Sequence, residues 1–316
     1  MNQPLSDSND RLSFSRLSFG MVLPHRSPDP LNMDEVGAVA QRAEALGFRD
    51  LWVTENTLDH VYSLDPMVAL TYAAALTKTI GLGVSVVTLP MHSPVHVAHQ
   101  IASLDVVSRG RAILGVGLGR DQEYKDFQIP MARRVGRFRE SVALIKAIWS
   151  EPKINFHGDF YQLEDAQMAL KPVQRPHPPL WLGGQHPDAI TRAVELGDGW
   201  MGSGAQTLTN FKLNLAQLRI ALDKVGRDPA SFSISKRVFL AVDEKPGVAR
   251  ERLNHWFTAI NGKPALTDTA GIHGTPAQVR EQIEVLASCG VNHILLNAVS
   301  HYGEQVDALA EAVGLG

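Results

Sequence analysis

Short apolar runs alternate with amphipathic segments along the chain from residue 17 onwards. Eight of these runs have the length and the residue types of buried strands: 17–23, 50–54, 80–90, 112–119, 179–184, 199–204, 234–242 and 293–299. The segments between them carry apolar residues at helical spacing, and residues such as Asn32, Ser93 and Thr275 stand where helices would begin. The pattern therefore predicts eight strands, each followed by a helix.

One stretch interrupts this alternation. Residues 151–179 contain five prolines and the hairpin-like sequence INFHGDFYQL, with Gly158 near its tip. We interpret the stretch as an insertion before the fifth strand. Eight strand–helix units in about 300 residues favour an α/β fold of the (β/α)8, or TIM-barrel, type, and an open doubly wound sheet is the alternative. Residues 1–16 are polar and predict a flexible tail, which leaves 17–316 as a single barrel domain.

Composition excludes several classes of protein. The 316 residues include 30 Lys and Arg against 33 Asp and Glu, which is not the basic balance of a nucleic-acid-binding protein. No run approaches the ~18 apolar residues of a membrane span, and the N-terminus has no signal-peptide pattern. Cys289 is the single cysteine, so neither an internal disulfide nor a thiolate metal cluster is expected. We expect a cytoplasmic enzyme.

The barrel fold selects the candidate site residues, because active sites of such barrels lie on the loops after the strands. The rule selects His25 and Arg26 after the first strand, Glu55, Asn56 and His60 after the second, 85–88 in the third, 117–124 after the fourth, 183–186 after the fifth, 202–204 after the sixth, and His255 after the seventh. No metal site is expected, since the His92–His96 spacing lacks the glutamate of a zinc protease. No serine or cysteine stands in a nucleophile motif.

Glycines at two neighbouring strand ends point to a phosphate. Gly183 and Gly184 end a strand directly before a helix that starts at Pro187, and free N–H groups at a helix N-terminus bind anions. Gly202 and Ser203 repeat this arrangement one strand later. A tight turn is the alternative for each. If the phosphate interpretation holds, the ligand is a phosphorylated substrate or cofactor.

Five segments resemble the bacterial luciferase-like family of flavin- and deazaflavin-dependent oxidoreductases. They are AEALGFRDLWVTEN (43–56), IGLGVSVVTLPMHSPVHVAHQIASLDVVSRGRAILGVGLG (80–119), LKPVQRPHPPLWLGG (170–184), AVELGDGWMGSG (193–204) and GTPAQVREQIEVLASCGVNHILLN (274–297). The resemblance covers nearly the whole chain from residue 17. It implies a TIM barrel that holds FMN, or alternatively the deazaflavin coenzyme, at the carboxyl ends of its strands.

The resemblance also implies roles for single residues. Ser85–Val86 matches a bulge in the third strand where the family often has a cis non-proline peptide that supports the cofactor ring. Gly183–Gly184 matches the phosphate-binding turn, and Tyr124 lies near a phosphate contact of some FMN-dependent members. Glu55–Asn56 matches a pair that is commonly Asp-His in deazaflavin dehydrogenases. Together with Gly117, Gly202 and Ser203, these are the expected cofactor-binding residues.

Two departures from the family pattern affect the predicted chemistry. Asn56 replaces a histidine that acts as an acid, base or substrate contact, and Arg120 stands where sugar-phosphate dehydrogenases of the family have a catalytic glutamate. Arg120 is expected to bind an anionic substrate, to pair with Asp121 or to serve only the surface. His25, His60 and His255 are the candidate proton donors.

These observations leave three functions open. The first is a luciferase-like monooxygenase that uses reduced FMN and O2 on a small organic substrate, with a separate flavin reductase as partner. The second is a deazaflavin-dependent dehydrogenase or reductase with oxygen-independent hydride transfer. The third is a non-catalytic flavin-binding protein, which would lack an open cavity beside the cofactor ring. A cofactor-free aldolase is disfavoured because Lys236 lies inside its strand. The resemblance further implies a homo-oligomer, commonly a dimer.

Overall fold

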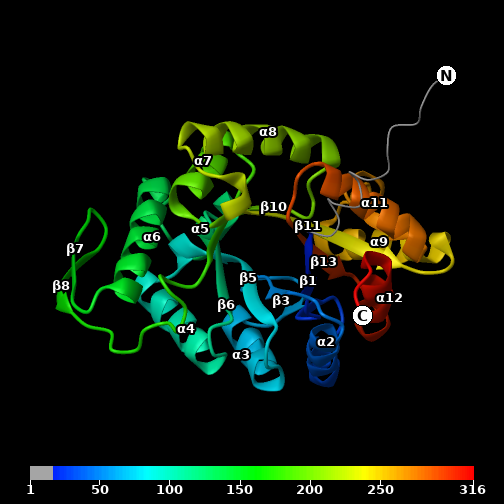
Figure 1. Ribbon diagram of the computed structural model, residues 1–316, viewed down its shortest axis with the longest axis horizontal. Coiled ribbons are helices and arrows are strands. Elements are labelled where there is room, and N and C mark those ends of the chain that lie inside the picture. Colours follow the sequence, from blue (N-terminus) through cyan, green and yellow to red (C-terminus); the bar gives the residue numbers. More distant parts are fainter. Residues whose placement is uncertain (1–16) are drawn as a thin grey trace.

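Eight parallel strands close into a barrel in the computed structural model, which describes residues 17–316 (Figure 1). In chain order they are β1 (Ser18–Val22), β3 (Asp50–Val53), β5 (Gly81–Thr88), β6 (Ala112–Gly117), β9 (Leu180–Gly183), β10 (Gly199–Gly202), β11 (Ser233–Val242) and β13 (His293–Ala298). Each strand pairs with its neighbours in chain order, and the β1–β13 pairing closes the ring. The predicted (β/α)8 barrel is confirmed. The predicted tail, residues 1–16, lies outside the described residues.

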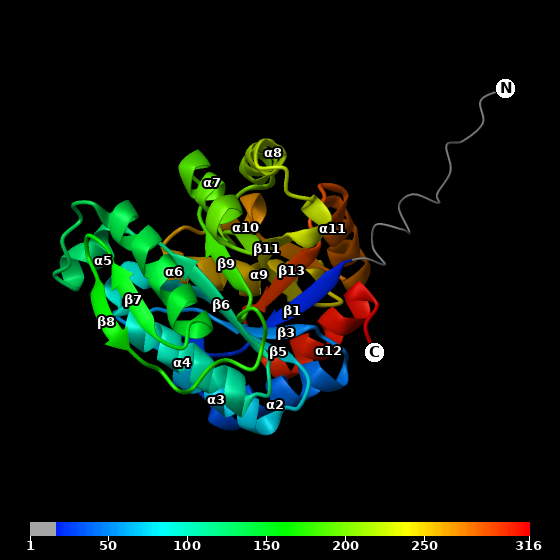
Figure 2. The ribbon, with the colours of Figure 1, turned by 60° about the vertical axis from the view of Figure 1, so that its left-hand side comes forward.

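Helices surround the barrel on all sides (Figure 2). The outer ring consists of α2 (Met33–Ala45), α3 (Pro66–Leu76), α4 (Pro94–Val107), α6 (Arg134–Ser150), α7 (Pro187–Leu196), α8 (Leu208–Lys224), α11 (Pro276–Ser288) and α12 (Tyr302–Val313). Side-chain caps begin several of them: Asn32 accepts from backbone N–H groups of α2, and Thr275 forms a capping box with Gln278. Ser93 stands at the predicted position before α4, but its side chain makes no capping hydrogen bond.

The predicted insertion before β9 forms a hairpin of β7 (Ile154–His157) and β8 (Gln162–Ala166) that projects from the barrel. One carboxylate fixes its tip, because Glu140 on α6 accepts from the backbone N–H groups of Asp159, Phe160 and Tyr161 at 2.6–2.9 Å. A Cβ at Gly158 would lie 2.1 Å from Glu140 Oε1. A side chain at this position would displace the Glu140 carboxylate, so glycine lets the hairpin tip keep its contact with this helix.

A second group of extra elements lies between β11 and α11. It comprises α9 (Pro246–Trp256), a turn of π-helix labelled η3 (Phe257–Asn261), α10 (Leu266–Thr269) and the short strand β12 (Ile272–Gly274), which pairs with the end of β11. Trp256 and Phe257 pack on Phe239 of β11 in a separate apolar cluster. These elements therefore cover one side of the barrel mouth. Short pieces β2 (Arg26–Ser27), β4 (Tyr62–Ser63) and α5 (Asp121–Asp126) complete the loops at this end.

Polar side chains fill the base of the barrel interior. Ser235 Oγ lies 2.7 Å from His293 Nδ1, and His293 Nε2 lies 2.9 Å from Asp50 Oδ1, which also accepts from the indole N–H of Trp52 at 2.6 Å. Burial acts to raise the pKa of Asp50, but the charge and hydrogen bond of His293 hold it below its usual range. Ser235, His293 and Asp50 have 0% exposure, so this Ser-His-Asp arrangement is closed to substrates and its role is structural.

An apolar layer lies in the same interior and separates this base from the mouth. It contains Val22, Trp52, Ile113, Trp181, Met201 and Leu295, with Val86 packed against them. The rings of Trp52 and Trp181 are 5.1 Å apart between centroids. Side chains that point inward beyond this layer form the floor of the mouth, where the candidate site lies.

In the described part of the chain, no helix combines the length and the apolar character that a bilayer span requires.

Candidate functional site

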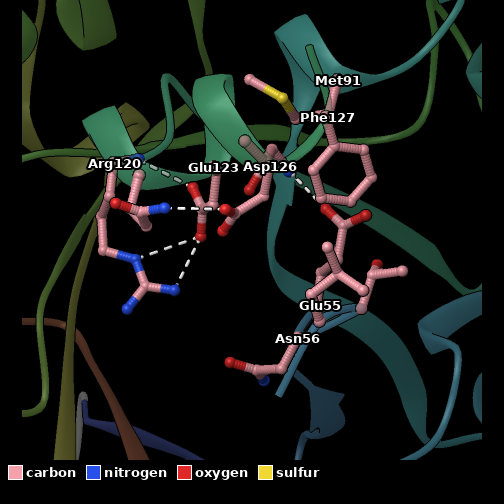
Figure 3. Close-up of a pocket in the computed structure, with 11 residues that line it drawn as sticks. Glu55, Asn56, Met91, Arg120, Glu123, Asp126 and Phe127 are labelled. Carbon is pink, nitrogen blue, oxygen red and sulfur yellow. Dashed lines mark hydrogen bonds and ion pairs between the residues drawn. The ribbon is translucent and has the colours of Figure 1, made fainter. Parts of the chain in front are cut away.

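A cavity of about 180 Å³ opens at the carboxyl ends of β3, β5 and β6, as the barrel rule predicts (Figure 3). Glu55 and Asn56 line it from the β3 side, while Arg120 and Glu123 approach from α5. Its other lining residues are Thr57, Leu58, Thr88, Met91, Gln122, Asp126 and Phe127. The cavity therefore combines carboxylates and amides with an apolar wall.

Glu55 is held in place by two hydrogen bonds. Its Oε2 accepts from the backbone N–H of Thr88 at 2.5 Å, and its Oε1 makes a short contact with His92 Nε2. The hydrogen bond to Glu55 raises the pKa of His92, against the opposing effect of burial. A carboxylate–imidazole couple therefore borders the cavity. His92 was not among the predicted site residues, because its partner comes from another strand.

His25 organises the loop that carries Asn56. Its Nδ1 donates to the Leu23 carbonyl at 2.8 Å, and its Nε2 accepts from the backbone N–H of Thr54 at 2.8 Å. Thr54 Oγ1 in turn accepts from the Asn56 amide at 2.7 Å. Burial lowers the pKa of His25 to about 4, so the ring is neutral at pH 7. With both ring nitrogens engaged, the geometry does not support the predicted proton donation from His25.

The peptide between Ser85 and Val86 is cis, as the resemblance implied. The β5–β6 register shifts between Val84 and Val87, which is the expected bulge. Two predicted glycines make room for the bulge: a Cβ at Gly117 would lie 2.6 Å from Val86 Cγ2, and a Cβ at Gly183 would lie 3.3 Å from Val86 Cγ1. Gly117 and Gly183 thus shape the floor of the mouth under the bulge.

Gly184 forms the turn into α7. Its φ is +152°, a conformation that L-residues rarely adopt, and a Cβ there would lie 2.6 Å from the Ala189 Cβ. Its carbonyl accepts from the Trp200 indole N–H at 2.8 Å, which fixes the turn. The backbone therefore passes close to the first turn of α7, with space that any side chain would fill. This geometry fits the predicted phosphate turn.

Gly202 and Ser203 do not repeat that geometry. A Cβ at Gly202 would lie 2.6 Å from Phe211 of α8, and the Ser203 carbonyl accepts from the Lys236 ammonium. Phe211 and Lys236 surround this turn, and the role of Gly202 and Ser203 as a second phosphate turn stays a prediction. Burial lowers the pKa of Lys236 to about 7.

Arg120 and Tyr124 differ from their predicted contacts. The Arg120 side chain is 79% exposed and pairs with Glu123 at 2.8 Å, whereas Asp121 pairs with Arg134. The expected pair with Asp121 is therefore wrong. The Tyr124 hydroxyl donates to the Leu118 carbonyl at 2.7 Å, and burial raises its pKa. This hydroxyl is already engaged, so the geometry does not support the predicted phosphate contact.

His60 and His255 lie outside the cavity. The His60 side chain is 63% exposed, and its Nε2 donates to the Ala259 carbonyl of η3 at 2.8 Å. His255 is exposed near the end of α9, where it lines a different pocket of about 300 Å³ between the loops after β1 and β13. The structure therefore gives neither histidine a position beside Glu55.

Arg237 is a residue of the mouth that the prediction missed. It points inward from β11, donates from Nε to Asn297 Oδ1 at 3.0 Å, and lies 4.7 Å from the centre of the Phe239 ring. Burial lowers its pKa to about 9, and the nearby charge of Arg26 acts in the same direction.

Among residues 17–316, no group of three or more His, Cys, Asp or Glu could hold a metal ion.

The similarity of this chain to known families identifies the family to which it belongs. The family model described as luciferase-like monooxygenase matches residues 17–293. The chain belongs to the luciferase-like monooxygenase family. The predicted resemblance is confirmed, and with it membership of a family of oxidoreductase enzymes.

Curated relatives of this luciferase-like chain are named dehydrogenases and reductases. An F420-dependent glucose-6-phosphate dehydrogenase of Kineococcus radiotolerans is 31% identical over 69% of this chain and 66% of its own length. An F420-dependent hydroxymycolic acid dehydrogenase of Mycobacterium tuberculosis is 29% identical over 76% of this chain and 67% of its own length. A 5,10-methylenetetrahydromethanopterin reductase of Archaeoglobus fulgidus is 27% identical over 80% of this chain and 86% of its own length. The chain thus spans about two thirds of the first two relatives.

Solved structures share the fold. A monooxygenase from Streptomyces bottropensis superposes with a TM-score of 0.81 at 23% identity, covering 94% of this chain and 98% of its own. An F420-dependent secondary alcohol dehydrogenase superposes with a TM-score of 0.82 at 20% identity, covering 94% of this chain and 99% of its own. A monooxygenase and a dehydrogenase therefore share the fold of this chain.

Proposed function

We propose that this luciferase-like enzyme transfers hydride between a small organic substrate and a deazaflavin coenzyme of the F420 type. Two of the relatives described above are named F420-dependent dehydrogenases. The observation that carries the proposal within this chain is the Glu55–His92 couple beside the cavity. Hydride exchange at a carbonyl or alcohol carbon needs a neighbouring group that gives or takes a proton.

The residues at the mouth fit such a coenzyme. The β5 bulge places the Val86 side chain over Gly117 and Gly183, and these glycines leave space at the floor of the mouth where a flat ring could rest. Gly184 leaves a side-chain-free approach to the N-terminal end of α7, where the positive end of the helix dipole favours a phosphate. When bound, the coenzyme supplies a ring carbon that accepts or gives hydride.

The chain's own groups would orient the substrate and handle the proton. Glu55 is fixed by Thr88 and His92, so its carboxylate faces the cavity at a constant position. Asn56 donates to Thr54 and keeps its amide oxygen as an acceptor for a substrate hydroxyl. The proton shared between Glu55 Oε1 and His92 Nε2 is then the one exchanged with the substrate oxygen. Met91 and Phe127 cover the cavity with apolar surface that excludes water.

A second candidate is an FMN-dependent monooxygenase served by a separate flavin reductase. Asn56 favours it, because this residue stands where the resemblance implies a histidine in deazaflavin dehydrogenases. The cavity beside Glu55 argues against a third alternative, a flavin-binding protein without turnover.

Cofactor selection tests the proposal. Purified protein is incubated with FMN or with F420, freed of unbound cofactor, and analysed by absorption and mass spectrometry of the released ligand. Selective retention of F420 supports hydride transfer, which anaerobic turnover assays with candidate alcohols would then follow. Selective retention of FMN refutes the first candidate and favours the second. Retention of neither contradicts both.

A further inference from the structure

Arg237 occupies the innermost polar position of the barrel mouth. Inward positions alternate along β11, and Ser235 on the same face reaches His293 at the base. Arg237 follows two residues later and contacts Asn297, which stands four residues after His293 on β13. The apolar layer with Leu295 lies between these two polar levels. The guanidinium therefore lies at the floor of the mouth.

No counter-charge accompanies this cation. Among the described residues, no carboxylate oxygen lies within 4 Å of Arg237, whose side-chain hydrogen bonds all go to Asn297 Oδ1. Its Nη1 makes none within the same part of the chain. The nearest titratable neighbours do not compensate it: His25 is neutral, and Arg26 is a second cation already paired with Asp59 at 2.6 Å.

Arg111 shows how the same fold satisfies a structural arginine. Its guanidinium nitrogens donate to the carbonyls of Ser108, Ile80, Ala74 and Thr77 and to the Thr77 hydroxyl, at 2.7–3.1 Å. Arg237 has a half-buried position but only one acceptor atom. Burying an uncompensated guanidinium disfavours folding, so a purely structural role does not account for it.

We propose that Arg237, oriented by Asn297, binds a carboxylate of the substrate at the floor of the barrel mouth. The guanidinium is planar and presents parallel N–H groups that match the two oxygens of a carboxylate. Contact with Phe239 on one face and with Asn297 at one edge leaves the Nη1 edge to the ligand. The assignment rests on the proposed function, since it places this substrate group in the mouth that would hold the coenzyme. Its substrate class is a small organic acid.

Carboxylate binding is measured by calorimetry and thermal shift on the cofactor-free protein. The probes are acetate and benzoate, each compared with its neutral amide at constant ionic strength. Wild type is compared with Arg237→Gln, which keeps a donor for Asn297 without the charge, and with Arg237→Lys. Arg42→Gln is the matched control, because Arg42 is an exposed arginine that pairs with Asp307 on the outside of the barrel.

We expect at least one carboxylate to bind wild type while its amide does not. A hydrogen bond to a charged group contributes enough that Arg237→Gln should weaken this binding about tenfold or more, whereas Arg42→Gln should leave it unchanged. Arg237→Lys should keep part of the affinity. Absence of binding to wild type, or equal binding to Arg237→Gln, overturns the proposal.

The coenzyme is the other possible source of an anion here, and its affinity is measured separately from the fluorescence of F420. If Arg237→Gln weakens F420 binding but leaves carboxylate binding intact, Arg237 serves the coenzyme and the inference is wrong. If carboxylates bind through Arg237 but F420 does not bind, the inference stands and the proposed function fails.

Discussion

Replacing Glu55 by glutamine should give a loss of stability that depends on pH. Glu55 raises the pKa of His92 above its ordinary 6.5. The couple therefore contributes stability that is complete below that unfolded value and disappears as the pH rises through the raised folded pKa. In Glu55→Gln the amide oxygen can still accept from the Thr88 N–H, while the amide NH2 can donate only to a neutral His92. The variant consequently loses the charged contact and keeps the neutral one.

The size of the effect follows from the exposure of the couple. A hydrogen bond between charged groups contributes roughly 1.5–3 kcal/mol when shielded from water. The His92 side chain is 34% exposed while that of Glu55 is 8% exposed, so solvent screening reduces the expected loss to about 1 kcal/mol. Urea unfolding at about pH 5.5 should show this loss, and at about pH 9 the difference should nearly vanish.

NMR titration of His92 provides an independent measurement, since its pKa should return toward the ordinary value in Glu55→Gln. His96→Gln is the matched control, because His96 is an exposed histidine on α4, shortly after His92, and makes no ion pair among the described residues. An equal loss of stability at both pH values, or an unchanged pKa of His92, would refute the reasoning.

Three further changes test other parts of the barrel. Gly184→Ala should lower the free energy of unfolding by about 1–3 kcal/mol and reduce F420 retention. Gly226→Ala is the control, because Gly226 also has a positive φ but open space around it, and it should lower only the melting temperature. Equal F420 retention by both variants would contradict the phosphate turn. Asp50→Asn should lower the free energy of unfolding by about 3 kcal/mol in urea, because it leaves His293 without its carboxylate, and the difference should shrink as acid protonates Asp50; a neutral outcome would contradict the role of the pair. Burial lowers the pKa of Lys236 to about 7. The free energy of unfolding of wild type should therefore rise by up to about 1.4 kcal/mol per pH unit from this group between about pH 7 and 10. Lys236→Met should lack this rise, and identical pH profiles of stability for the two proteins would contradict the lowered pKa.

The barrel was predictable because its signal is repeated and local. Each buried strand is an apolar run bounded by turn residues, and each predicted run contains the strand observed, except that β11 begins one residue earlier. Local cap chemistry placed helix starts such as Thr275 correctly. The π-helical turn after Trp256 and the short strand β12 were not predicted, because both depend on packing against β11 rather than on their own sequence.

The candidate site was predictable in position but not in chemistry. The rule that active-site loops follow strand ends selected Glu55 and Asn56, which line the cavity, whereas the cis peptide at Ser85–Val86 was implied by the family resemblance. The protonation state of His25 depends on its burial and on hydrogen-bond partners that follow two different strands. The sequence alone does not reveal either of these. Arg237 did leave a signal, since it is a charged residue at an inward position of an apolar strand.

The layer formed by Trp52, Trp181, Met201 and Leu295 divides the barrel into two chemical compartments. Ions and polar ligands cross such an apolar layer only at a large desolvation cost, so ligands that enter the mouth do not reach the polar residues at the base. Side chains at the mouth can then be replaced over evolution without breaking the hydrogen bond between Asp50 and His293. One scaffold can in this way accept new substrates while the buried contacts at its base stay unchanged.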